Sequence, residues 1–134
     1  MSEAELIYQA SEYLDRIWSM QQWWASISIG VLIMAHIASA RLNLFLIIIC
    51  LGLYTSYTLY MLQMSGENYE TIFALATDLE TLIDSGEAKT NAAVELAGIR
   101  STSPILYFIT FGGTYLSVVA YVVFSYRRSR ASDA

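Results

Sequence analysis

The chain has 134 residues, a length typical of one domain, with 56% hydrophobic and 14% charged residues. Charged residues make up about a quarter of soluble domains, and a chain of this size cannot bury so many apolar side chains. The composition therefore excludes an ordinary soluble globule and indicates an integral membrane protein. The net charge of −5 argues against a general attraction to nucleic acid, and the single cysteine excludes an internal disulfide.

The first 22 residues are predicted to form an amphipathic helix, because apolar side chains recur at helical spacing with acidic residues largely opposite. Ser2 and Glu5 have the spacing of a capping box, in which each side chain binds the other residue's backbone N–H. We expect the helix to start there.

Three segments are long and apolar enough to cross a hydrocarbon core of about 30 Å, which takes ~20 residues. They are predicted at about 23–40, 42–64 and 104–126, and none contains Asp, Glu, Lys or Arg. Almost nothing separates the first two, so they should form a tight antiparallel hairpin. The third should begin at Ser103 and Pro104, because serine caps helices and proline suits their first turn. We thus predict an all-α integral membrane protein with three transmembrane helices.

The segment 65–103, between the second and third spans, is predicted to be helical and acidic, with an interruption at Ser85 and Gly86 and a weaker helix through about 87–99. Acidic helices match anionic lipid poorly. We therefore expect this segment and residues 1–22 to pack together as a cap outside the membrane. The alternatives are helices at the headgroup boundary without mutual contact, or an acidic surface that docks on a partner or gathers cations.

These elements are predicted to form a single membrane domain, residues 1–134, oriented by its arginines. Arg41 lies at the hairpin turn and three further arginines lie in the basic tail, so the positive-inside rule places the N-terminus outside and the C-terminus in the cytoplasm, in a bacterial inner membrane. Trp18, Trp23 and Trp24 fit the outer interface. In chain order the parts are 1–22, 23–64, 65–103, 104–126 and 127–134.

The second span carries two polar stripes, which predict two contacting faces. One stripe contains Tyr54, Thr58 and Met61, and we expect Tyr54 to form a hydrogen bond with another helix. The other contains Gly52, Ser56, Tyr60 and Gln63. One face would serve the chain's own bundle and the other a second subunit or a bound molecule.

Each span also has two small residues four positions apart, a spacing that lets membrane helices approach closely. With Tyr54, they form the candidate helix-contact set: Ser26, Gly30, Gly52, Tyr54, Ser56, Gly113 and Ser117. The third span has a stripe of hydroxyls, which predicts hydrogen bonds between helices or the lining of a narrow pore. Its candidate pore-lining residues are Thr110, Thr114, Ser117 and Tyr121.

His36 is a weak candidate for cofactor binding, and most such histidines are neutral and bonded to a neighbouring hydroxyl or carbonyl. Two copies of the chain could each supply one such ligand to a haem iron, so haem or a pigment stays open although no cofactor is predicted. His36 and Cys50 alone do not make a metal site. The sequence has no phosphate-binding loop or metalloprotease motif, so we expect no enzyme activity.

Three functions follow, in order of preference. The first is a non-catalytic membrane protein that acts through helix–helix assembly, as a homo-oligomer or an accessory subunit of a larger complex. The second is an oligomeric pore: in length, number of spans, orientation and basic tail the chain resembles the three-span phage holins, a resemblance of topology from which the long acidic segment 65–103 departs. The third is a haem-anchoring or electron-transfer subunit, which rests on His36. In each case the partners are the lipid bilayer and other membrane subunits or copies of the chain, and not nucleic acid.

Overall fold

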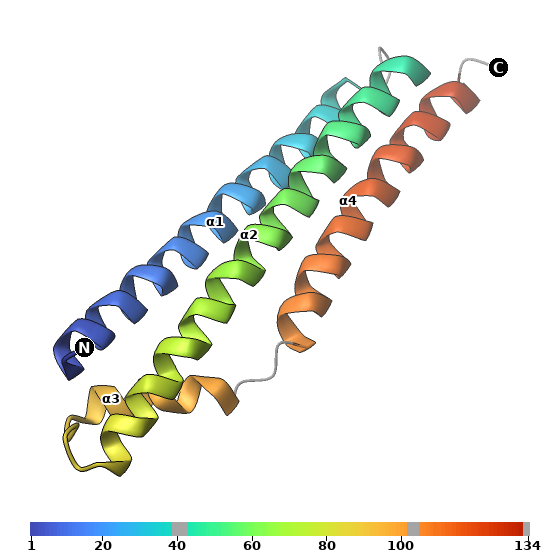
Figure 1. The fold of residues 1–134 in the computed structure, drawn as a ribbon. Helices are drawn as coiled ribbons and strands as arrows, with labels where there is room; N and C mark the ends of the chain where they lie inside the picture. Colours follow the sequence, from blue (N-terminus) through green and yellow to red (C-terminus); the bar gives the residue numbers. More distant parts are fainter. Residues whose placement is uncertain (39–42, 102–104, 133–134) are drawn as a thin grey trace. The chain divides into compact units, whose positions relative to one another are not determined.

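The computed structural model describes residues 1–38, 43–101 and 105–132, which are helical almost throughout (Figure 1). The helices are α1 (Glu3–Ile37), α2 (Leu44–Asp84), α3 (Asn91–Ala97), the 3-10 helix η2 (Gly98–Ser101) and α4 (Ile105–Ser132). The predicted all-α class is confirmed.

The helix boundaries differ from the predicted ones at two places. Helix α1 runs without a break through residues 22 and 23, and α2 continues through residues 64 and 65 to Asp84. Neither junction has a proline, and α2 continues through Ser65 and Gly66 although both residue types favour helix ends. Each junction separates a charged stretch of sequence from an apolar one, and the helical backbone continues through this change of side chains. The predicted start of the third span at Ser103 and Pro104 lies outside the described residues.

Local sequence explains most of the observed helix ends. Glu5 Oε2 accepts a hydrogen bond from Ser2 N at 2.9 Å and Ser2 Oγ accepts one from Glu5 N at 3.4 Å, so the capping box is confirmed. Helix α2 starts where Asn43 Oδ1 accepts from Leu46 N at 2.8 Å. It ends at a turn in which Gly86 has φ +78°, a conformation that favours glycine.

Within the part of the chain that the structure describes, two helices are long and apolar enough to cross a membrane by length and composition: α2 and the part of α4 from Tyr107 to Ala131. The predicted first span does not reach this standard within the described part of α1. Its 15 residues from Trp23 to Ile37 extend about 22 Å, short of the ~30 Å of a hydrocarbon core, and they include His36. Three spans are therefore not confirmed.

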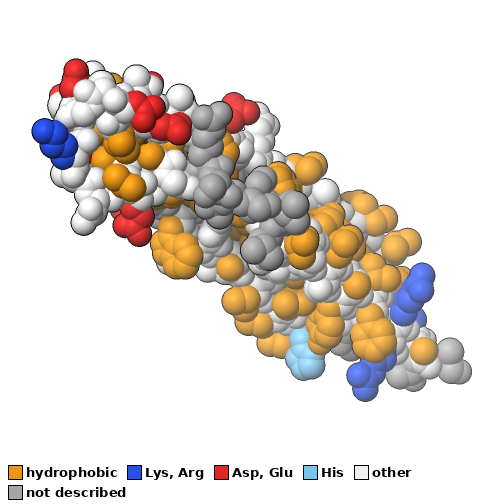
Figure 2. Space-filling view, turned by 90° about the horizontal axis from the view of Figure 1, so that it is seen from below, with side chains coloured by type: hydrophobic (Ala, Val, Ile, Leu, Met, Phe, Trp, Pro, Cys, Tyr) orange, Lys and Arg blue, Asp and Glu red, His pale blue; other side chains and the backbone are white. Residues whose placement is uncertain are grey.

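The chain divides into two units, each of which takes part of α1 and part of α2. We call the first, Met1–Gln21 and Leu62–Ser103, the acidic unit, because it holds eleven acidic and three basic residues, a formal net charge of −8. We call the second, Gln22–Met61 and Pro104–Ala134, the apolar unit. On the face drawn in Figure 2, acidic side chains gather in one region and hydrophobic side chains surround the single histidine.

In the acidic unit, the beginning of α1, the end of α2 and α3 pack together. Its core contains Leu6 and Ala10 from α1, Leu75 and Leu79 from α2, and Ala93 from α3. The expectation that residues 1–22 and 65–103 pack against one another is therefore met.

The carboxylate of Glu3 links the start of α1 to the start of α3 in the acidic unit. Glu3 Oε1 accepts hydrogen bonds from Thr90 N at 3.0 Å and from Thr90 Oγ1, while Thr90 Oγ1 accepts one from Ala93 N at 3.2 Å and so caps α3. Lys89 N also donates to Glu3 Oε2 at 3.4 Å. The hydrogen bond from the Thr90 side chain is the largest cause that lowers the pKa of Glu3 below its ordinary value.

In the apolar unit, α1, α2 and α4 lie side by side (Figure 1). Ala35, Ile47 and Val122 form a buried cluster near one end, and Trp24, Thr58 and Phe111 meet further along. Helix α2 is therefore antiparallel to α1 and α4.

Candidate functional site

The interior of the apolar unit is a network of aromatic rings and hydroxyl groups centred on Tyr54. Tyr54 is 2% exposed, and its hydroxyl lies 2.8 Å from Ser28 Oγ of α1. The expected hydrogen bond from Tyr54 to another helix is present. Ser28 Oγ also donates to the carbonyl of Trp24 at 2.8 Å, so the same hydroxyl binds its own helix and the next one.

Trp24 extends this network to α4. Its indole Nε1 donates to Thr58 Oγ1 at 3.1 Å, and Thr58 Oγ1 donates to the carbonyl of Tyr54 at 2.8 Å. The Trp24 ring stacks on Phe111 with centroids 4.0 Å apart. The sequence predicted Trp24 to be an interface anchor at the surface, and this prediction is wrong because Trp24 is buried. Trp18 and Trp23 are exposed. The indole N–H needs a partner when buried, and Thr58 supplies it.

Tyr115 links α4 to α2. Its hydroxyl lies 2.7 Å from Thr55 Oγ1, and its ring is 5.6 Å from that of Tyr54. Sequence reasoning missed Tyr115, Ser28 and Phe111. A signal for Ser28 was available, because it follows Trp24 by four residues and so lies on the same helix face.

The two stripes predicted on α2 have different surroundings in the structure. Tyr54, Thr58 and Met61 are buried within the chain. Gly52, Ser56 and Tyr60 are exposed. One contacting face is thus accounted for by the chain's own bundle, and the second carries small and polar residues outward.

The small-residue pairs do not bring helices together within the described chain. A Cβ atom added at Gly30, Gly52 or Gly113 would meet nothing within 4 Å, and Ser26 and Ser117 are exposed. The described contacts between helices of the apolar unit use other residues, such as the stacked rings of Trp24 and Phe111 and the buried cluster of Ala35, Ile47 and Val122. Both serines donate to a carbonyl of their own helix, Ser26 to Gln22 at 2.8 Å and Ser117 to Gly113 at 2.7 Å.

The hydroxyls of α4 do not face one common space in the described chain. Thr110 and Ser117 are exposed, Thr114 is half-buried and Ser125 is buried. Tyr121 is half-buried and bonded to α1. Of the four candidate pore-lining residues, Thr110 and Ser117 therefore lie on the outer surface of the unit.

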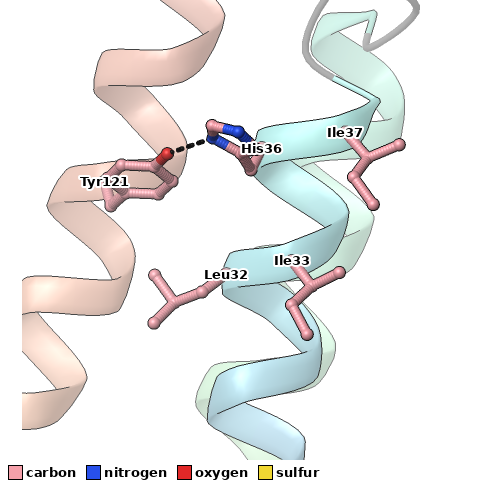
Figure 3. A pocket seen from close by; sticks show the side chains of 5 residues that line it. All are labelled: Leu32, Ile33, His36, Ile37 and Tyr121. Carbon is pink, nitrogen blue, oxygen red and sulfur yellow. Dashed lines mark hydrogen bonds between the residues drawn. The ribbon is translucent and has the colours of Figure 1, made fainter.

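His36 and Tyr121 meet at an open pocket in the surface of the apolar unit (Figure 3). His36 Nδ1 lies 2.8 Å from the hydroxyl of Tyr121, so the histidine is bonded to a neighbouring hydroxyl as its commonest role predicts. Leu32, Ile33 and Ile37 complete the lining. Among the described residues no group of three or more His, Cys, Asp and Glu side chains is placed to hold a metal ion.

Comparisons with known protein families, characterised proteins and solved structures give no match.

Proposed function

We propose that the protein is an integral membrane protein with three spans that acts by helix–helix assembly, as a homo-oligomer or as an accessory subunit of a larger membrane complex, and that it is not an enzyme. The surface of the apolar unit supports insertion. Seventeen of the 21 large hydrophobic side chains that are exposed among the described residues belong to this unit. Exposed apolar surface on this scale is unfavourable in water and favourable against lipid.

We propose that α1 also crosses the membrane, in addition to α2 and α4, because it has the same surroundings as those two helices. It is bonded to α2 through Ser28 and Tyr54 and to α4 through His36 and Tyr121. It exposes Ile33 and Ile37 much as its neighbours expose leucine and phenylalanine. A helix that packs beside two such helices and exposes isoleucine on its outer face has lipid as its matching solvent.

The arginines support the proposed orientation. The charged side chains in the described part of the apolar unit are Arg127, Arg128 and Arg130, all at the end of α4. Arg41 follows α1 in the sequence. The positive-inside rule then places this end in the cytoplasm and the acidic unit outside.

The observation that carries the assembly proposal is the outward stripe of α2. Gly52 and Ser56 are exposed within an otherwise apolar surface, and the space beside Gly52 is open. Small residues on a lipid-facing helix allow a second helix to approach closely, and such close packing drives association between membrane helices. Gly113 and Ser117 are likewise exposed on α4, so a second helix can approach closely there as well.

Native mass spectrometry of the purified full chain tests this proposal, because it reports copy number and bound subunits together. We expect a defined oligomer or a co-purified subunit, which Gly52→Leu and Gly113→Leu reduce by blocking close approach. Gly112→Leu is the matched control: this neighbouring glycine is also exposed and open but points about 100° away around the helix. A wild-type monomer without any partner would contradict assembly.

A pore built from several copies is the second candidate, favoured by the outward hydroxyls of Thr110 and Ser117 on α4. In an oligomer these would line a polar path. Ion leak from liposomes that is abolished by Ser117→Leu and unchanged by Leu116→Ala would select the pore over simple assembly. Tight liposomes with an intact oligomer would select assembly.

A further inference from the structure

Two sets of contacts fix the heights of α1, α2 and α4 relative to one another in the apolar unit. At the first, the tryptophan level, Trp24 donates to Thr58 and stacks on Phe111. At the second, the alanine level, the buried cluster contains Ala35, Ile47 and Val122. Eleven residues separate the two levels in each of the three helices, a helical rise of about 16 Å. A height measured along one helix can therefore be transferred to the other two.

Exposed aromatic rings lie beside the tryptophan level. Trp23 is adjacent to Trp24, and Tyr60 is two residues from Thr58, so both lie within about 3 Å of that level along their helices. Both side chains are more than half exposed, and Phe108 is exposed within about 5 Å of the same level. Rings with an apolar body and a polar tip favour the headgroup region of a bilayer. The tryptophan level is therefore suited to the outer boundary of the hydrocarbon.

Positive charge marks the opposite end of the apolar unit. Arg127 is exposed and lies about 8 Å beyond Val122 of the alanine level. No charged residue lies between Phe108 and Arg127, which are about 28 Å apart along α4. On α2, the apolar stretch from Leu44 to Tyr60 measures about 24 Å. The hydrocarbon core that fits these helices is therefore about 24–28 Å thick, less than the average of about 30 Å.

The short apolar part of α1 agrees with this thickness. The 15 residues from Trp23 to Ile37 extend about 22 Å, which leaves a hydrocarbon core of about 30 Å uncrossed. The same length falls only about 2 Å short of the apolar stretch of α2, and a bilayer adapts to so small a difference by thinning locally. A thin bilayer is thus one that all three helices can cross.

We propose that the apolar unit is matched to a bilayer whose hydrocarbon core is about 24–28 Å thick. Trp23 and Tyr60 lie at its outer headgroups and Arg127 lies at its inner headgroups. The partner is thus a thin bilayer, and not the sterol-rich kind whose core measures about 32–33 Å. Tilt of the helices shortens the distance that they span, so it favours the thin bilayer further. The inference rests on the proposed membrane insertion.

The test measures the relative affinity of the protein for lipids of different chain length. The full chain is reconstituted in brominated phosphatidylcholine, which quenches the fluorescence of the exposed Trp23 on contact. Unbrominated phosphatidylcholines with short, intermediate and long monounsaturated chains are then added in turn as competitors. We expect the lipid with a core of about 27 Å to compete best, and the lipid with a core of about 33 Å to compete about threefold less well. Equal competition, or strongest competition by the shortest or longest chains, would overturn the proposal.

Variants at the end of α4 test the inner boundary. Arg127→Leu combined with Arg128→Leu makes Arg130 the first charge and lengthens the charge-free part of α4 by about 4.5 Å. Competition by the longest lipid should then rise about twofold. Arg128→Leu combined with Arg130→Leu is the matched control, because it removes two charges but retains Arg127. It should keep the wild-type order of lipids. No shift in the first variant, or the same shift in both, would overturn the assignment of Arg127 to the boundary.

Alkaline extraction of the membranes distinguishes failure of this inference from failure of the proposed function. A protein that stays inserted but shows no preference for chain length refutes the match to a thin bilayer alone. A protein released by alkali refutes the proposed insertion, and the match with it.

Discussion

Leu6 and Leu79 are buried in the acidic unit, whereas Leu53, Leu59 and Leu116 of the apolar unit are each more than 60% exposed. In the acidic unit carboxylates cover the surface and apolar side chains fill the core. In the apolar unit the hydroxyls of Ser28 and Thr58 are buried and bonded while leucines face outward. Because α1 and α2 contribute to both units, the difference is one of side chains and not of backbone. It teaches that burial of apolar side chains shapes the acidic unit, whereas the apolar unit has the outward leucines that the proposed insertion in lipid requires.

The largest effect should come from exchanging a buried leucine of the acidic unit. Leu79→Ala leaves a cavity beside Leu6 and Ala93 and should cost about 3 kcal/mol, because its side chain is fully buried. Hydrogen exchange of the α3 amides should then accelerate roughly 100-fold. Leu59→Ala on the same helix is the control, and its effect should stay below about 0.5 kcal/mol. Equal losses of stability in Leu79→Ala and Leu59→Ala would show that leucine burial does not distinguish the two units.

A charge on the apolar unit should have an effect almost as large. Leu53→Asp puts a carboxylate where lipid is proposed, and insertion should become about 3 kcal/mol less favourable. The fraction of protein that resists alkaline extraction measures this. Thr77→Asp in the acidic unit places the same charge on an exposed position of α2 and should leave extraction unchanged. Normal insertion of the Leu53 variant would show that this face does not meet hydrocarbon.

A smaller effect should come from the hydrogen bond at the centre of the apolar unit. Tyr54→Phe keeps the stacked ring but removes the bond to Ser28, at a cost of about 1 kcal/mol. Tyr60→Phe removes an exposed hydroxyl of the same helix and should have almost no effect. Thermal unfolding in detergent, followed by tryptophan fluorescence, compares the two. Identical midpoints would mean that the buried hydroxyl contributes nothing to stability.

The sequence was sufficient for the all-helical class and for the two separate stripes of α2, but it did not assign which stripe points inward. Hydrophobic periodicity and lack of charge located α2 and α4, and the Ser2–Glu5 spacing located the start of α1. The stripe of Tyr54 and Thr58 was separated from that of Gly52 because residues four apart share a helix face. These features depend on residues that are close in sequence.

Features that depend on contacts between distant residues were not predictable. Trp24 resembles an interface anchor until Thr58, 34 residues away, and Phe111 are seen beside it. The glycine pairs indicated close helix packing, but Gly30, Gly52 and Gly113 face outward in the described chain, with open space beside each. Tyr121 was assigned to a hydroxyl stripe, and its bond to His36 follows from the packing of α4 against α1.

The smallest expected effect is a pH dependence confined to the acidic unit. Glu3 has a lowered pKa when the chain is folded, chiefly because Thr90 donates to its carboxylate, whereas an unfolded chain gives it the ordinary value of 4.5. The stability contributed by Glu3 is therefore fully present above pH 4.5 and declines as the pH falls through the lower, folded pKa. Protonation removes the charge that the N–H donors of Lys89 and Thr90 stabilise.

Glu3→Gln separates this effect from general acid unfolding. The amide keeps one acceptor oxygen but no charge, so the variant should be slightly less stable than wild type at neutral pH and should lose less stability between pH 7 and about pH 3.5. Glu70→Gln removes the same charge from an exposed position of α2 and should follow wild type. Thermal unfolding midpoints at both pH values provide the measurement. If Glu3→Gln and Glu70→Gln lose the same stability on acidification, the hydrogen bond from Thr90 to Glu3 is not what links α1 to α3. Burial of Leu6 and Leu79 alone then holds the acidic unit together.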